Sequence, residues 1–187
     1  RLNNWHDFFN AACWASFPLT KFQFNKLHIS ESNNSKNTAQ ANRSRSRDLL
    51  TLIDESGILI AYSSDHHLKL NQAHDWNRLF VREKNAWMSQ LKPFIIGHGL
   101  YEQCVTPYIG LTAKAHYIKV EPTFFTTSLE QQYQYLDTQL AQQLVQGGGF
   151  PNTKPLPLPI LGIPGWYSNQ DDGFYSNTKY FRPLRQQ

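Results

Sequence analysis

Histidine and carboxylate side chains occur at spacings that a helix would turn into shared faces. His98 and Glu102 are four residues apart, so a helix would present an imidazole and a carboxylate on one side. His6 and Asp7 form a second polar pair near the start of the chain. If these segments meet, His6, His98 and Glu102 supply two imidazoles and a carboxylate to a divalent metal ion, with Asp7 beside them as a supporting group or general base.

This ligand set predicts metal-assisted hydrolysis. A zinc, manganese, iron or nickel ion would lower the pKa of a bound water molecule and generate a nucleophile near neutral pH. Nearby basic side chains would neutralise a phosphate-containing or other anionic substrate. The predicted catalytic residues are His6, Asp7, His98 and Glu102, and the predicted anion-binding residues are Lys21, Arg43, Arg45 and Arg47.

The same histidines also have purely structural interpretations. A histidine beside a carboxylate is often only a satisfied hydrogen-bonding group of the core, which is the alternative for His98 and Glu102. Asp7 in a first helical turn would favour the positive end of the helix dipole, while His6 hydrogen-bonds a neighbouring loop. At this level a hydrolase and a non-enzyme are both consistent with the sequence.

Three alternating arginines indicate a different class of function. An extended backbone would aim Arg43, Arg45 and Arg47 to one side, where their guanidinium groups could clamp a phosphate. The protein would then be a non-catalytic binding module for nucleic acid or for an acidic protein partner. The net charge of +4 permits this function without requiring it. The alternative is a solvated loop edge.

Several classes of protein are excluded by what the sequence lacks. It contains no P-loop, dinucleotide-binding or zincin motif, and no Cys-x-x-Cys pair. Cys13 and Cys104 lie far apart among apolar residues, which fits a reducing cytoplasm. No apolar run of about 18 residues is present, so we expect no membrane span. Because Arg1 replaces an initiator Met, we expect the chain to be part of a longer native protein.

Apolar periodicity predicts the helices that position the polar groups. A first helix is expected from Asn4, and a second from Pro18 to about Ile29. A third is expected to start at Pro93 and to run to Val105, although its two glycines each cost a helix interior about 1 kcal/mol relative to alanine. The segment 129–146 has a capping box at Ser128, a leucine stripe and three glycines at its end, so it is the clearest helix of the chain.

Strand-like segments complete an α+β fold. The runs 49–53 and 58–62 flank a short acidic segment that ends in glycine, which predicts a β-hairpin, and 111–120 predicts a further strand. We expect one globular core over 1–149, with a small antiparallel sheet covered by helices and a flexible loop over 30–47. The prolines of 150–187 predict a tail without regular structure, while its leucines predict that it packs on the core.

A set of short motifs distributed along the chain is similar to a known family. The motifs include Trp5-His6-Asp7-Phe8-Phe9-Asn10, Gly97-His98-Gly99-Leu100-Tyr101-Glu102 and Leu161-Gly162-Ile163-Pro164-Gly165-Trp166. Together they resemble a family of uncharacterised bacterial proteins known only as a domain of unknown function. The resemblance covers nearly the whole chain, implies alanine as the commoner residue at Gly99, and implies no established activity. No catalytic residue is therefore transferred from it.

Overall fold

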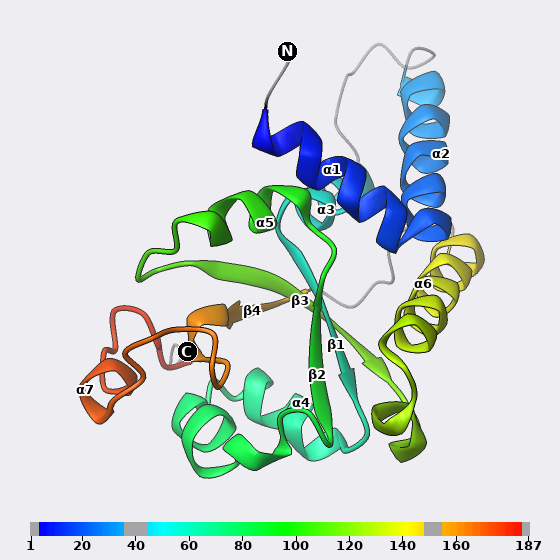
Figure 1. Cartoon of the computed structure of the whole chain (residues 1–187). Helices are drawn as coiled ribbons and strands as arrows, with labels where there is room; N and C mark the ends of the chain where they lie inside the picture. The colour runs from blue at the N-terminus through cyan, green and yellow to red at the C-terminus, as the bar shows by residue number, and fades with distance from the viewer. Residues whose placement is uncertain (1–3, 36–44, 148–154, 185–187) are drawn as a thin grey trace. The chain divides into compact units, whose positions relative to one another are not determined.

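The computed structural model describes residues 4–35, 45–147 and 155–184 (Figure 1). The chain divides into two compact units that alternate along the sequence. The first comprises Arg1–Gly57, Ile95–Glu102 and Ser128–Lys154, and the second comprises Ile58–Phe94, Gln103–Thr127 and Pro155–Gln187. Helices dominate the first unit and the sheet belongs to the second, so the α+β class is confirmed. Among the described residues, no helix has both the length and the hydrophobicity needed to cross a membrane.

The predicted helices of the first unit form with the caps expected from the sequence. They are α1 (Trp5–Ser16), α2 (Pro18–Ser35), the first turns of α5 (His98–Val105), and α6 (Leu129–Gln146). The unit also contains α3 (Arg45–Ser56), a helix that was not predicted. The Asn4 side chain accepts a hydrogen bond from the backbone N–H of His6 and begins α1. At α6, Ser128 and Gln131 exchange the two hydrogen bonds of a capping box.

The N-terminus of α2 is capped by a side chain from α6. Pro18 at the first position has no N–H group. The backbone N–H groups of the next two residues, in contrast, need a hydrogen-bond acceptor. Both donate to the Asp137 carboxylate, from Leu19 N at 2.9 Å and from Thr20 N at 2.8 Å. The Thr20 hydroxyl also donates to the Asp137 carbonyl at 3.2 Å. Asp137 is buried, so this carboxylate fixes α2 against α6 as a charge-assisted cap.

The predicted hairpin over 49–62 is wrong in its first half. Residues 49–53 lie in α3, whose buried side chains Leu50 and Ile53 are three residues apart and face the core of the first unit. Strand β1 (Gly57–Tyr62) follows directly. The helices also occupy much of the expected loop over 30–47, since α2 extends to Ser35 and α3 starts at Arg45. Residues 36–44 lie outside the described part.

A four-stranded sheet with the order β2-β1-β3-β4 forms the second unit. Its other strands are β2 (Leu91–Ile95), β3 (Thr112–Lys119) and β4 (Leu156–Pro159). The helix expected from Pro93 is therefore wrong at its start, because residues 93–95 pair in the sheet as part of β2 and α5 begins only at His98. The sheet is mixed, whereas an antiparallel sheet was expected. Strands β3 and β4 are antiparallel. Strands β1 and β3 run in the same direction, since a hydrogen bond from Val120 N to Tyr62 O joins their C-terminal ends. The remaining elements are α4 (Asp65–Gln72), η1 (Arg78–Arg82), η2 (Lys84–Ala86), η3 (Pro122–Thr126), η4 (Ile160–Gly162) and α7 (Asp172–Tyr175).

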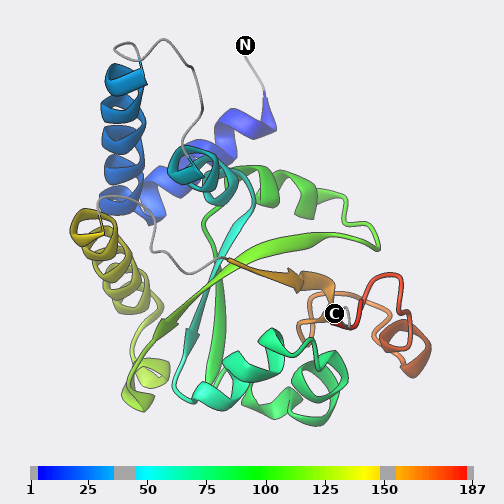
Figure 2. The same cartoon turned by 180° about the vertical axis from the view of Figure 1, so that it is seen from behind.

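The proline-rich segment contains regular structure after all. Pro157 pairs with Lys114 and Pro159 with Thr112, so β4 is an edge strand beside β3 (Figure 2). Prolines are tolerated at an edge because one side of the strand has no neighbour to receive N–H groups. Beyond β4, the Tyr180 hydroxyl donates to Leu111 O at 2.7 Å and accepts from Leu161 N at 3.0 Å. The segment 155–184 is thus an integral part of the second unit.

A buried histidine in the second unit makes its stability depend on pH. His67 Nε2 lies 3.1 Å from Glu83 Oε2, and His66 and Arg78 bind the same carboxylate. Burial lowers the pKa of His67 in spite of the attraction of Glu83. A lowered pKa in the folded state means that the stability from neutral His67 is present above about pH 6.5 and is lost as pH falls through the folded pKa.

We therefore expect the thermal unfolding midpoint to fall when the pH is lowered from about 7.5 to about 5.5. His67→Gln should reduce this fall, because glutamine carries no proton whose binding favours unfolding. His66→Gln is the matched control, since His66 contacts the same carboxylate from a more exposed position, and it should keep the wild-type pH dependence. Equal falls in all three proteins would contradict this interpretation.

Candidate metal centre

Two histidines from distant segments face each other in the first unit. The Asn4 cap positions His6 in the first turn of α1, and His98 is the first residue of α5. Their Nε2 atoms lie 3.1 Å apart, with the rings in an edge-to-face arrangement. The His98 side chain is 6% exposed and that of His6 38% exposed. One imidazole therefore lies in the core and the other reaches the surface.

A third potential ligand comes from the end of α3. Glu55 Oε1 lies 3.4 Å from His98 Nε2, and the ligand atoms of His6, Glu55 and His98 all lie within 4.8 Å of one another. Ligand atoms of a tetrahedral zinc ion, at bond lengths of about 2.0–2.1 Å, are about 3.3 Å apart. The distances from His98 Nε2 to the other two atoms bracket this value. The two distances measured from His98 Nε2 thus fit two edges of a tetrahedral site.

A carboxylate lies on the far side of each imidazole ring. Glu102 Oε2 is 3.0 Å from His6 Nδ1, and Asp54 Oδ2 is 3.8 Å from His98 Nδ1. The other oxygen of Asp54 is 2.5 Å from the ammonium group of Lys21, which is buried. Metal-binding histidines commonly donate their second N–H to a carboxylate in this way, which fixes the tautomer and directs the other nitrogen to the metal.

The protonation states show what a metal ion would change. With a neutral His6 whose Nδ1 donates to Glu102, the His6 Nε2 carries a lone pair, and His98 Nε2 donates the proton of the contact between the rings. The buried Nδ1 of His98 then has no hydrogen-bond partner and turns a lone pair toward Asp54. With an ion bound by both Nε2 atoms, the His98 proton would reside on Nδ1 and face the Asp54 carboxylate. Ion binding would thereby remove an unfavourable pairing in the core.

Two glycines allow α5 to approach the end of α3. A Cβ atom at Gly97 would lie 2.5 Å from Gly57 N and 2.6 Å from Glu55 O, both backbone atoms. At Gly99 it would lie 2.6 Å from Glu55 Oε2, the end of a flexible side chain. Gly97 N and Ile96 N both donate to Gly57 O, and these two hydrogen bonds hold the segment before α5 against the residue that follows α3. The glycines on either side of His98 are therefore what bring its ring to Glu55.

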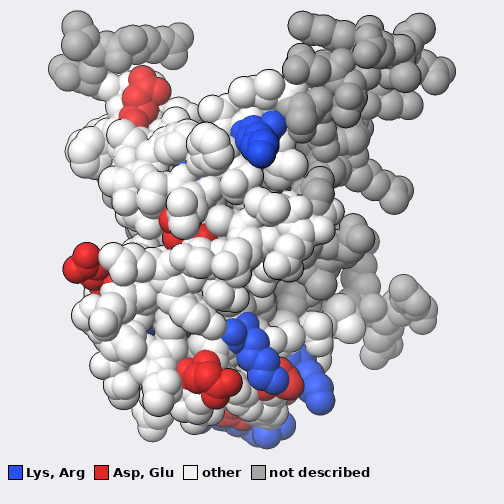
Figure 3. All heavy atoms as spheres, turned by 90° about the vertical axis from the view of Figure 1, so that its right-hand side faces the viewer, with Lys and Arg blue, Asp and Glu red and all other residues white. Residues whose placement is uncertain are grey.

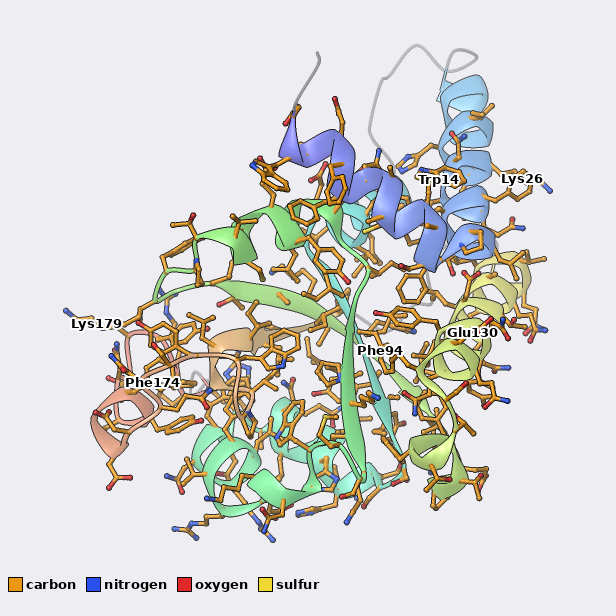
Figure 4. The ribbon with its side chains drawn as sticks, in the orientation of Figure 1. Trp14, Lys26, Phe94, Glu130, Phe174 and Lys179 are labelled. Atoms are coloured by element: carbon orange, nitrogen blue, oxygen red, sulfur yellow. The ribbon has the colours of Figure 1, made fainter. Side chains whose placement is uncertain are left out.

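The other predicted site residues have different surroundings. Asp7 is exposed in the first turn of α1 and belongs to none of the contacts described above. Lys21 on α2 pairs with Asp54, and its ammonium group lies 6.0 Å from the centre of the ring of Trp14, which is labelled in Figure 4. Cys13 is buried, and burial raises its pKa to about 11, which makes its thiol a poor ligand.

The arginine strip is not extended where the structure describes it. Arg45 and Arg47 lie in the first turn of α3, so the backbone at these two residues is helical and not extended. Arg43 lies outside the described residues. On the face drawn in Figure 3, the Lys and Arg side chains of the described residues are divided between separate places, those at the bottom beside Asp and Glu side chains, and form no continuous basic surface. Nucleic-acid binding through the arginines stays a prediction from the sequence.

Asp54 and Glu55 were not predicted as site residues. The sequence predicts a hairpin turn at Asp54 and Glu55, and acidic residues are common in such turns for conformational reasons. The available signal is the spacing of Leu50 and Ile53, which is compatible with a helix that places both carboxylates in its last turn. Nothing in the sequence indicates that this turn meets His98.

The fold and the geometry together define an α+β protein with a candidate centre of two histidines and one carboxylate. The chain belongs to a protein family of unknown function, DUF3025, whose family model matches residues 1–185. This match confirms the family resemblance noted in the sequence. Neither the curated proteins nor the solved structures include a significant match to the chain.

Proposed function

We propose that this protein is a metal-dependent hydrolase whose ion is bound by His6, Glu55 and His98. The observation that carries the proposal is the convergence of two Nε2 atoms and one carboxylate oxygen within 4.8 Å of one another, with a carboxylate beside each Nδ1. Two histidines and one glutamate leave a fourth position open, which is the ligand arrangement of catalytic zinc sites. Zinc, manganese, iron and nickel are all compatible with imidazole and carboxylate ligands.

Each residue of the chain has a defined part in this proposal. An ion in the site would supply Lewis acidity and lower the pKa of water. Glu102 holds His6 in the tautomer that directs its Nε2 to the ion, and Asp54 would face the Nδ1 proton of His98 once the ion is bound. Lys21 balances the charge of Asp54 inside the core, which leaves Glu55 and Glu102 as the net negative charge around a divalent cation. Glu102, predicted from the sequence as a ligand, has an orienting role here.

The partial exposure of the cluster supports access by a substrate. Glu55 is 47% exposed and His6 38% exposed, whereas His98 anchors the site from within. We propose a phosphate-containing or other anionic substrate, since an ion with an open position attracts and polarises such groups. The two free cysteines support a reducing compartment, and the proposed setting is the cytoplasm of a bacterial cell.

Elemental analysis of untagged protein, purified without chelator, tests whether the protein binds a metal ion. We expect close to one zinc, manganese, iron or nickel ion per chain, or uptake of one equivalent after the metal is added. The loaded protein should hydrolyse a member of a panel of phosphomonoesters, phosphodiesters and carboxylic esters, and chelator treatment should abolish this activity until the metal is restored.

His28→Ala provides the matched control, because His28 lies on α2 and contributes no atom to the cluster. It should bind metal and hydrolyse the substrate as the wild type does. A protein that takes up none of the four metals would contradict the metal centre. Stoichiometric metal without hydrolysis of any ester in the panel would contradict the hydrolase and leave the centre a structural one.

A further inference from the structure

The second unit contains a cavity that has no part in the proposed metal centre. Its volume is about 390 Å³, within the range of small-molecule sites. The wall is built from four separated segments of the chain. It includes Trp76, Thr112, Pro157, Pro159, Tyr180 and Arg182. All of its lining residues belong to the second unit.

One part of this cavity is flat and apolar. Trp76 and Tyr180 are buried aromatic residues, and the Trp76 ring stacks on Phe80 with the planes 11° apart. Pro157 and Pro159 add rigid apolar surface from the edge strand β4. Flat rings backed by other rings are surfaces on which a heterocycle can stack.

Another part of the cavity is basic. Lys179, Arg182 and His74 line it, and no Asp or Glu does. Lys179 and Arg182 are exposed, and within the described residues neither forms an ion pair. Figure 4 shows Lys179 extending from the C-terminal segment toward solvent. Basic groups that no carboxylate neutralises, next to aromatic surface, favour a ligand with both an anionic group and a flat ring.

The basic and aromatic parts are held together by hydrogen bonds to one carbonyl group. The Arg182 carbonyl accepts from Trp76 Nε1 at 2.7 Å and lies 3.0 Å from His74 Nδ1. The Arg182 guanidinium Nε donates to Lys179 O at 3.0 Å. His74 has a φ of 54°, a left-handed conformation that is uncommon outside glycine and is found disproportionately at ligand sites. Segments more than a hundred residues apart are thus fixed around one cavity.

We propose that this cavity binds a nucleoside monophosphate. The heterocyclic base would pack on the wall formed by Trp76, Tyr180 and the two prolines, and the phosphate would bind Arg182 and Lys179 at the rim. The site is independent of the metal centre because every lining residue lies in the other unit. It therefore adds a ligand-binding function, whichever reaction the centre performs.

Isothermal titration calorimetry with AMP, GMP, CMP and UMP tests the proposal. We expect at least one of them to bind with one site per chain, and the corresponding nucleoside and inorganic phosphate each to bind at least about tenfold more weakly. Arg182→Gln and Lys179→Gln should each weaken binding of the nucleotide about tenfold or more. The carbonyl of residue 182 remains in the variant, so the hydrogen bonds to Trp76 and His74 are kept.

Lys69→Gln is the control, since Lys69 is an exposed lysine of the second unit on α4 and does not line the cavity. It should bind the nucleotide as the wild type does, and so should protein treated with chelator. Absence of binding by all four nucleotides would overturn the proposal. Binding that survives the combined Arg182→Gln and Lys179→Gln substitutions would overturn it as well. Equal affinity for inorganic phosphate would reduce the site to a general anion site and overturn the role of the aromatic wall.

Discussion

His98→Ala protein should bind the metal ion at least about 100-fold more weakly than the wild type. His98 is the buried ligand, and its Nε2 lies within 3.4 Å of the ligand atoms of both His6 and Glu55. Glu55→Gln should have a comparable effect, because an amide oxygen lacks the negative charge that offsets a divalent cation. The measurement is competition for the metal with a chromophoric chelator of known affinity.

Glu102→Gln separates an orienting residue from a ligand. Removing a carboxylate that holds a ligating histidine reduces metal affinity by about 10–100-fold, less than removal of the ligand itself. The unfolding midpoint provides a second readout, since a ligand at 100 times its Kd stabilises the folded state by about 2.7 kcal/mol. Added metal should raise the midpoint of the wild type and of His28→Ala, but not that of His98→Ala. A metal-induced shift retained by His98→Ala would show that the ion binds elsewhere.

Gly97→Ala should destabilise the first unit by about 3 kcal/mol or more, at the upper end of the cost of overpacking a well-packed interior. The new methyl group would lie within 2.7 Å of three backbone atoms, in Gly57 and Glu55, and none of them can rotate away. The end of α3 and the start of α5 would have to separate. Chemical denaturation monitored by circular dichroism measures the loss, and the metal affinity should fall with it.

Gly99→Ala tests the role of Glu55 as a metal ligand with little disturbance of the packing between α3 and α5. Its methyl group would meet Glu55 Oε2 at 2.6 Å and Glu55 O at 3.1 Å, and the carboxylate can move by rotation of its side chain. Alanine also improves the helix by about 1 kcal/mol relative to glycine, so stability should change little. Because the displaced carboxylate no longer faces His98, metal affinity should still fall. Metal binding unchanged from the wild type would remove Glu55 from the ligand set.

The parts of the fold that were predictable from sequence are those with local signals. The capping box at Ser128 and the Asn4 cap define the starts of α6 and α1 without reference to the rest of the chain. The i, i+4 spacing of His98 and Glu102 likewise places both on one face of α5, where both reach the ring of His6. For these elements, the local sequence is enough to predict the structure.

The errors occur where tertiary contacts decide between two local options. The run 49–53 is short and apolar, a pattern shared by a buried strand and a buried helix, and packing in the first unit selects the helix. That choice also determines the role of Glu55, which a hairpin turn would have exposed to solvent. The prolines of β4 are compatible with a strand only because its position is at the sheet edge, and edge position is not a local property.

The cap on α2 has a consequence for how the protein is made. Thr20 and the Asp137 carboxylate that caps it are 117 residues apart. At about 5–20 residues added per second, the ribosome synthesises Asp137 roughly 6–23 s after Thr20. Until then the first backbone N–H groups of α2 lack their acceptor. Lys21, the partner of Asp54, lies in that same uncapped turn. The cap of α2 is therefore added after every residue of the proposed centre, His6, Glu55 and His98, has been synthesised.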